Sequence, residues 1–210
     1  MEDVLDLYEE AYDPSSPVVC FDERPCFLIA ETKQIIPARP GQLERYDYTY
    51  EKCGAANIFG FFEPLTAWRD MKVTQKRTKP EFAHCMKDLV DVYYPQARQI
   101  RVVLDQLATH TKAALYDTFE PQEARRIATK LEFHFTPKHG SWLNMVEIEF
   151  SVLSRQCLNR RIPDADTLEQ EVETWTKQRN DEHVTVDWHF TTPDARSRLK
   201  RLYPLLNPVK

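Results

Sequence analysis

The sequence predicts a mixed α/β protein, in which one β-sheet has helices packed on it. Short apolar, β-prone runs fill the first part of the chain, which is typical of strands that pair antiparallel. After residue 78, helical patterns alternate with two further apolar runs, which is typical of strands joined in parallel. The chain has 210 residues, which is the size of one ordinary domain.

Six segments alternate or run apolar in the way that strands do. The first stops at Asp22 and the fifth stops at Asp105, so each of these strands ends at a carboxylate. The second follows the first so closely that we expect the two to form a hairpin. Polar residues, prolines and glycines over residues 37–54 predict a long connection. The expected strands cover residues 18–21, 27–30, 56–62, 68–74, 100–104 and 131–135.

Helical spacing of apolar residues occupies most of the remaining chain. Thr78 can cap a helix whose first turn holds Pro80 and Glu81, and we expect that helix to end at Pro95. The other expected helices cover residues 112–131 with a break at Pro121, 141–158, 166–180 and 192–203.

The negative charge of the chain is concentrated at its start. Residues 1–17 hold six acids and no base, so removing them changes the net charge from −5 to +1, with 27 acids against 28 bases. We therefore expect an acidic leader over residues 1–17 and one near-neutral domain over residues 18–205. A neutral domain neither supports nor excludes a nucleic-acid partner.

The composition argues against several other classes of protein. No apolar run is long enough to cross a membrane, and no signal peptide begins the chain. Five widely spaced cysteines without a C-x-x-C pair indicate a reducing cytoplasm rather than a disulfide framework or a zinc-thiolate site. Only four glycines occur and no glycine-rich phosphate loop is present, which excludes the common nucleotide-binding signatures.

Carboxylates at strand ends are the first candidates for a functional site. A charge beside a buried strand is costly unless a cation or hydrogen bonds compensate it, and open α/β sheets bind ligands beyond the carboxyl ends of their strands. Asp22 and Asp105 can therefore share one site, although each alone also fits a turn or a helix cap. The helix over residues 141–158 offers a third acid, Glu147 or Glu149, on the two flanks of its apolar seam. Periodicity does not choose between them, and the alternative is that both are solvated.

Three carboxylates of this kind suit a hard divalent ion. Mg²⁺, or Mn²⁺ in its place, prefers oxygen ligands. Two such ions about 3.5–4 Å apart can clamp a phosphodiester during in-line displacement. The ions would also supply the positive charge that the neutral domain lacks. The pattern predicts metal-dependent phosphoryl-transfer chemistry, with hydrolysis of small phosphate esters as an alternative.

Three motifs carry a resemblance to a known family. They are Val-Val-Cys-Phe-Asp-Glu at 18–23, Val-Val-Leu-Asp-Gln-Leu-Ala-Thr-His at 102–110, and Thr-Pro-Lys-His-Gly-Ser-Trp-Leu-Asn-Met-Val-Glu at 136–147. In this order they resemble the catalytic domain of mariner-related bacterial insertion-sequence transposases. That group belongs to the DDE superfamily and shares a ribonuclease H-like fold with retroviral integrases. The resemblance covers nearly the whole chain.

The resemblance implies a catalytic and metal-binding triad of Asp22, Asp105 and Glu147. The family's Asn-x-x-Glu pattern, here Asn144 to Glu147, favours Glu147 over Glu149. The resemblance further implies Mg²⁺-dependent DNA cleavage at the terminal inverted repeats of an insertion sequence, followed by attack of the freed 3′-hydroxyl on target DNA, typically at TA. The family acts as assemblies of two or more chains, so we expect a homodimer on DNA in the bacterial cytoplasm, associated with the nucleoid.

The chain departs from the family pattern in two ways. Relatives have Asn where this chain has Gln106 and Ala108, and amides beside a metal site help to orient its ligands. The family also carries N-terminal helix-turn-helix modules, which we expect to be absent here, so that the chain is a fragment, one half of a split reading frame or the partner of a separately encoded DNA-binding part. Two alternatives stay open: a non-catalytic, transposase-derived DNA-binding protein, and a ribonuclease H-like nuclease that cuts without joining.

Further polar residues near the motifs are candidate DNA contacts. His110 follows the second aspartate closely, with a helix cap as its alternative role, and Lys138 and His139 precede the third motif's helix, with a plain polar loop as theirs. Arginines hold phosphates without sequence specificity, although many on helices are simply solvated. The candidate DNA-binding residues are His110, Lys138, His139, Asn144, Arg155, Arg160 and Arg161.

Overall fold

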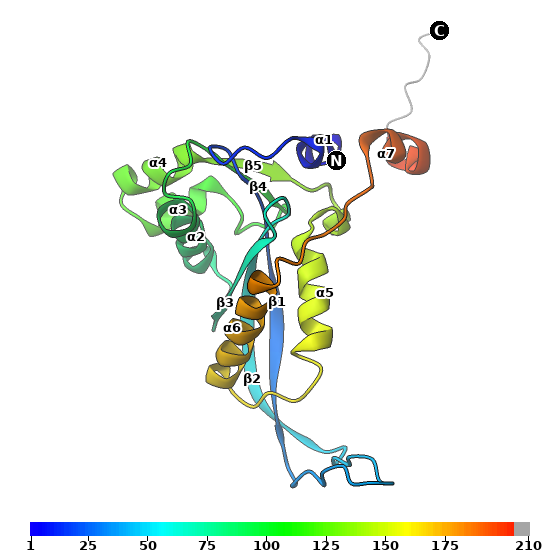
Figure 1. Ribbon diagram of the computed structural model, residues 1–210. Coiled ribbons are helices and arrows are strands. Elements are labelled where there is room, and N and C mark those ends of the chain that lie inside the picture. Colours follow the sequence, from blue (N-terminus) through cyan, green and yellow to red (C-terminus); the bar gives the residue numbers. More distant parts are fainter. Residues whose placement is uncertain (204–210) are drawn as a thin grey trace.

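The protein is built on one five-stranded sheet with the strand order β3-β2-β1-β4-β5 (Figure 1). The structure, a computed structural model, describes residues 1–203, so the last two residues of the domain expected over 18–205 lie outside the described residues. β1 to β3 pair antiparallel, whereas β4 and β5 add in parallel to β1, so the expected mixed sheet is confirmed. The strands are β1 Val18–Glu31, β2 Tyr50–Glu63, β3 Trp68–Thr74, β4 Ile100–Leu104 and β5 Leu131–Phe135.

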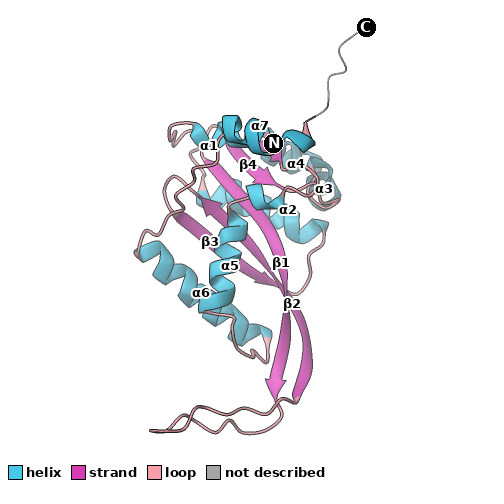
Figure 2. Ribbon diagram, turned by 90° about the vertical axis from the view of Figure 1, so that its right-hand side faces the viewer, coloured by secondary structure: helices cyan, strands magenta, loops and turns pink. Residues whose placement is uncertain are grey.

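Helices cover both faces of this sheet (Figures 1 and 2). Three helices, α2 to α4, pack on one face, α5 and α6 pack on the other, and α1 and α7 lie at one end. The helices are α1 Glu2–Glu9, α2 Lys79–Asp88, α3 Lys112–Thr118, α4 Pro121–Lys130, α5 Val146–Gln156, α6 Ala165–Asp181 and α7 Thr192–Arg198. A π-helical turn, Leu89–Tyr93, continues α2, and 3₁₀ turns cover Ser141–Leu143 and Lys200–Leu202.

Alternation along β1 divides the hydrophobic core in two. Val18 and Cys20 lie in the core beneath α5 and α6, whereas Val19 and Phe21 lie in the core beneath α2, α3 and α4. Successive side chains of a strand point to opposite faces of the sheet. The next residue, Asp22, is therefore directed to the face that α5 covers.

β1 is longer than the sequence predicts. Residues 27–30 were expected to form the hairpin partner of residues 18–21, but they continue the same strand and pair with β2. β4 pairs only with Val18–Cys20, so the rest of β1 has one open edge, where Pro25 is tolerated. The predicted hairpin is wrong, and Asp22 lies within a strand rather than at its end.

Residues 32–49 connect β1 to β2 at the tip of a hairpin that projects away from the rest of the fold (Figures 1 and 2). Arg161 fastens this tip, because its guanidinium donates to the backbone oxygens of Asp47 and Thr49, both at 2.9 Å, and pairs with Glu31 at 2.5 Å. Arg161 therefore has an internal role at this tip, and its expected contact with DNA stays a prediction.

The acidic segment over residues 1–17 is part of the fold, so the expectation of a separate leader is wrong. Helix α1 buries Val4 and Leu5 completely. Its acids lie on the outer side, where Glu2 pairs with Arg196 of α7 at 2.7 Å. An amphipathic helix combines an acidic outer face with a buried apolar one. Residues 1–203 contain no helix that is long and apolar enough to cross a membrane.

Candidate active site

Asp22 and Asp105 lie at the same level of two neighbouring parallel strands. The register pairs Cys20 of β1 with Val103 of β4. Continuing that register by two residues sets Asp22 beside Asp105, directly after the end of β4. The expected proximity of the two aspartates therefore follows from the topology of the sheet.

The carboxyl group of Asp22 is buried among other acids. The residue is only 7% exposed, and its Oδ1 accepts a hydrogen bond from the backbone N of Glu23 at 2.8 Å. Burial, together with the negative charges of Asp105, Glu147 and Glu23, raises the pKa of Asp22 to about 7, although that hydrogen bond lowers it. The site therefore concentrates negative charge that a cation would offset.

The raised pKa of Asp22 predicts that Asp22→Asn stabilises the metal-free protein at neutral and alkaline pH. An acid with a higher pKa in the folded than in the unfolded state binds its proton more tightly when folded, so stability is lost as pH rises from about 4 to about 7. The shift from 3.8 to about 7 corresponds to at most about 4 kcal/mol. Urea unfolding in the presence of a chelator should show the variant as more stable at about pH 8, with the two proteins converging below about pH 4. Equal stability at both pH values would contradict the assignment.

A glycine lets α5 approach the sheet beside Asp22. Gly60 of β2 is the cross-strand partner of Asp22. A Cβ atom at this position would lie 2.8 Å from the ring of Phe150 and 2.9 Å from a methyl group of Val146. Since both contacts belong to α5, the missing side chain allows the helix to lie directly on β2, and it brings Glu147 with it.

Glu147 lies on the exposed flank of α5, on the side from which its charge acts on Asp22. Burial raises the pKa of Glu147, the positive charge of Arg24 lowers it, and the negative charge of Asp105 raises it. Arg24 is anchored on the same helix through a hydrogen bond to the backbone oxygen of Phe150 at 2.9 Å. Sequence reasoning did not single out Arg24, which is the positively charged neighbour of this acid.

Glu149 lies in the protein core, away from the solvent-exposed flank of α5. Its side chain is fully buried and pairs with Arg69 of β3 at 2.9 Å and with Arg179 of α6 at 2.8 Å. The alternative that both glutamates are solvated is therefore wrong for Glu149. Only Glu147 is free of such pairing with arginine and borders the two aspartates.

His110 is buried, so its expected DNA contact is not supported. Its Nδ1 lies 2.7 Å from Oδ1 of Asp105, and its Nε2 lies 2.9 Å from Oε2 of Glu23. Burial lowers the pKa of His110, but the hydrogen bonds to the two carboxylates outweigh this effect and raise the pKa to about 9. In turn, the hydrogen bond from His110 lowers the pKa of Asp105. The side chain of His110 is 0% exposed and cannot reach a phosphate at the surface.

Asn144 is also buried, which corrects its expected DNA contact. Its Nδ2 donates to the backbone oxygen of Phe21 at 2.8 Å, directly before Asp22. Asn144 has an extended backbone, so the helix expected from Ser141 starts only at Val146. The hydrogen bond fixes the start of α5 to β1 beside the acids.

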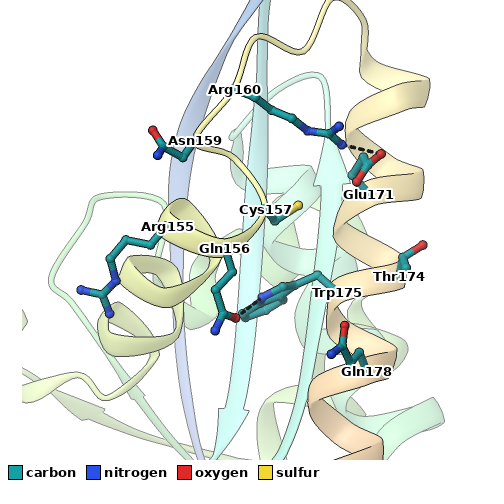
Figure 3. A pocket seen from close by; sticks show the side chains of 9 residues that line it. All are labelled: Arg155, Gln156, Cys157, Asn159, Arg160, Glu171, Thr174, Trp175 and Gln178. Carbon is teal, nitrogen blue, oxygen red and sulfur yellow. Dashed lines mark hydrogen bonds and ion pairs between the residues drawn. The ribbon is translucent and has the colours of Figure 1, made fainter. Parts of the chain in front are cut away.

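The remaining candidate DNA contacts lie at the surface. Lys138 and His139 are exposed in the loop before the 3₁₀ turn. Arg155 and Arg160 line a cavity of about 480 Å³ between the C-terminal end of α5 and α6, where Arg160 pairs with Glu171 at 2.5 Å (Figure 3). Arg155 therefore remains the less constrained of the two arginines.

The donor chemistry of the acids fits a divalent cation. Oδ1 of Asp22 and Oδ1 of Asp105 are both occupied by hydrogen bonds, whereas their second oxygens have no hydrogen-bond partner within residues 1–203. Carboxylate oxygens are the ligands that Mg²⁺ and Mn²⁺ prefer. Within the same described residues, however, no group of three or more His, Cys, Asp or Glu side chains is close enough to hold a metal ion as the side chains stand. The residues fit the ion chemically, although their carboxylates do not converge on one point.

A mixed sheet with acids on adjoining parallel strands defines a ribonuclease H-like domain. The chain belongs to the DDE superfamily endonuclease family, whose sequence model matches residues 17–169. That range contains all three expected acids. The resemblance seen in the motifs is thus confirmed at the level of the family, whose enzymes use divalent metal ions.

Solved structures are similar to this chain at low sequence identity, and the first of them supports the fold. The crystal structure of the Mos1 strand transfer complex has a TM-score of 0.55 and 13% identity, covering 86% of this chain and 52% of that chain. The simian T-cell lymphotropic virus intasome in complex with the PP2A regulatory subunit B56 gamma has a TM-score of 0.47 and 11% identity, covering 92% and 57%. This chain therefore spans about half the length of the Mos1 chain. No curated protein is significantly similar in sequence.

Proposed function

We propose that this chain is the catalytic domain of a transposase, which cleaves DNA at the ends of an insertion sequence and joins the freed 3′-hydroxyl to target DNA. One observation carries the proposal. Asp22 of β1 and Asp105 after the end of β4 lie side by side in the sheet, and the charges of Asp105 and of Glu147 from α5 both raise the pKa of Asp22. Membership of the DDE superfamily endonuclease family supports the reaction class.

The three acids have distinct surroundings in this proposal. They would hold two Mg²⁺ or Mn²⁺ ions, which activate the attacking oxygen and stabilise the leaving oxygen of a phosphodiester when bound. Asp22 supplies a buried carboxylate whose position is fixed by its strand. Asp105 is held by His110, and the exposed Glu147 borders the solvent from which DNA approaches.

Helix α5 and the loop before it offer the DNA-facing surface. Lys138 and His139 lie at its start and are exposed. Arg155 lies two turns beyond Glu147, about 12 Å along the helix axis. These side chains would hold the phosphate backbone without reading its sequence. We extend the proposal to a homodimer on DNA, recognition of the terminal inverted repeats by a helix-turn-helix part, a TA target, and association with the nucleoid.

A cleavage and joining assay tests the proposal. The purified chain is incubated with supercoiled plasmid and Mg²⁺ or Mn²⁺, together with a labelled duplex that ends in the 3′-hydroxyl of the inverted repeats flanking its coding sequence. We expect metal-dependent nicking and transfer of the label to the plasmid. Asp105→Asn should abolish both activities, whereas the matched control Asp117→Asn, at an exposed aspartate on α3, should leave them unchanged.

The alternatives predict different results in the same assay. Nicking without transfer of the label identifies a ribonuclease H-like nuclease that cuts without joining. DNA binding without nicking, together with Mn²⁺ binding that is unaffected by Asp105→Asn, identifies a non-catalytic DNA-binding protein. Full activity of Asp105→Asn would show that this carboxylate is not part of the site.

A further inference from the structure

A buried histidine connects the two strands that carry the aspartates. The imidazole of His110 lies between the carboxylates of Asp105 and Glu23, at 2.7 Å from one and 2.9 Å from the other. The side chains of His110 and Glu23 are 0% and 3% exposed. Each ring nitrogen of His110 therefore faces one carboxylate oxygen at hydrogen-bond distance, so the ring bridges the two acids. Charge-assisted hydrogen bonds of this kind are roughly twice as strong as neutral ones.

The orientation of the ring is fixed by its surroundings. Phe82 of α2 and Phe21 of β1 pack against the imidazole, with ring centroids at 4.9 Å and 5.6 Å. The backbone N of His110 donates to the oxygen of Leu107 at 2.9 Å, which closes the loop after β4. A ring held by both packing and hydrogen bonds has little freedom to leave Asp105.

Glu23 extends this connection to Asp22. Its backbone N donates to Oδ1 of Asp22 at 2.8 Å, while its carboxylate accepts from His110 on the other face of the sheet. The guanidinium of Arg77 lies 3.9 Å from the second oxygen of Glu23 and is the other charge facing this group. Two hydrogen bonds and one residue of backbone thus join Asp22 to His110.

Asp105 receives its hydrogen bonds on a single oxygen. Oδ1 accepts from His110 at 2.7 Å and from the backbone N of Leu107 at 3.0 Å. This arrangement fixes the plane of the carboxylate and leaves Oδ2 without a hydrogen-bond partner within residues 1–203. An orphaned carboxylate oxygen beside a second aspartate is suited to ligate a cation.

We propose that Glu23 and His110 are positioning residues, which hold the Asp105 carboxylate relative to Asp22 so that one oxygen of each is available to a divalent cation. The inference rests on the proposed function, because it assumes that Asp105 is a metal ligand. Neither Glu23 nor His110 touches the reacting atoms in this arrangement. Groups that orient metal ligands typically contribute 10–100-fold to metal affinity.

Mn²⁺ binding to the full chain, measured by calorimetry without DNA, tests the inference. His110→Asn and Glu23→Ala should each weaken Mn²⁺ binding by about 10–100-fold. Glu23→Gln retains an oxygen that can accept from Nε2, so it should recover part of the loss caused by Glu23→Ala. His84→Asn replaces an exposed histidine on α2 and should bind Mn²⁺ like the unaltered chain.

A spectroscopic measurement separates positioning from simple loss of structure. In the metal-free protein, nitrogen NMR should show that Asp105→Asn changes the Nδ1 signal of His110 while the remaining spectrum stays that of a folded protein. If Glu23→Ala does not fold, Glu23→Gln is measured as well, because it keeps the shape of the side chain. Unchanged Mn²⁺ affinity in folded His110→Asn and Glu23→Ala, with affinity lost in Asp105→Asn, overturns the positioning role alone. Unchanged affinity in Asp105→Asn overturns the proposed metal site itself.

Discussion

Glu147→Gln is expected to slow metal-dependent DNA nicking by about 10³-fold or more without lowering the stability of the protein. The loss of one metal-binding carboxylate removes several kcal/mol of stabilisation of the transition state, and each 1.4 kcal/mol is a factor of about ten in rate. Glu147 is exposed, and no salt bridge joins it to another side chain within residues 1–203. Its replacement by an isosteric amide therefore removes function but no packing.

The measurement pairs plasmid nicking rates with the midpoint of urea unfolding. Glu169→Gln replaces an exposed glutamate on α6 and should match the unaltered chain in both measurements. A nicking rate within about tenfold of the unaltered chain would remove Glu147 from the triad. A lowered unfolding midpoint would show that Glu147 contributes to the fold, which its exposure argues against.

Local patterns were sufficient to predict most of the sheet. The segments over residues 68–74, 100–104 and 131–135 are strands with the expected bounds, because each is a short apolar or alternating run between clear breaks. β1 was misjudged because its apolar run is interrupted by the charged Asp22 and Glu23. The strand nevertheless continues through Pro25. The tolerance of this proline depends on β4 covering only the start of β1, and that is a property of the assembled sheet.

The choice between Glu147 and Glu149 shows what helical periodicity alone cannot predict. The two residues lie about 200° apart around the helix, so they face different surroundings. Which one meets the aspartates depends on the rotation of α5 against the sheet. Gly60 permits the close approach of Phe150 and Val146 to the sheet in this rotation, and no helical pattern in the sequence predicts that contact. The family motif supplied the choice, and the burial of Glu149 agrees with it.

Contacts between distant parts of the chain were not predictable. His110 and Glu23 are 87 positions apart, and Arg161 lies 130 positions from Glu31. Both basic residues resembled surface contacts for DNA, because a sequence shows charge but not burial. Helix α1 is different, since the helical spacing of Val4, Leu5 and Leu7 was a usable signal that its acidic composition masked.

Glu149→Ala is expected to destabilise the protein by about 3–5 kcal/mol, which is a large part of the about 5–15 kcal/mol that stabilises a typical domain. The carboxylate of Glu149 pairs with Arg69 at 2.9 Å and with Arg179 at 2.8 Å. Arg69 is completely buried and also donates to the backbone oxygens of Arg179 and Val184. Removal of Glu149 would leave two guanidinium groups in the core without their counter-charge, and it would release the contact of α5 with β3 and α6.

Urea unfolding of Glu149→Ala and Glu147→Gln gives a matched comparison on one helix. The midpoint should fall sharply for Glu149→Ala and stay constant for Glu147→Gln, whereas nicking by the folded fraction should fail only for Glu147→Gln. Glu149→Gln keeps the volume of the side chain but removes its charge, so a loss similar to that of Glu149→Ala assigns the effect to the ion pairs rather than to a cavity. A free energy of unfolding that falls by less than about 1 kcal/mol in Glu149→Ala would mean that the arginines find other partners. It would also mean that the position of α5 does not depend on this network.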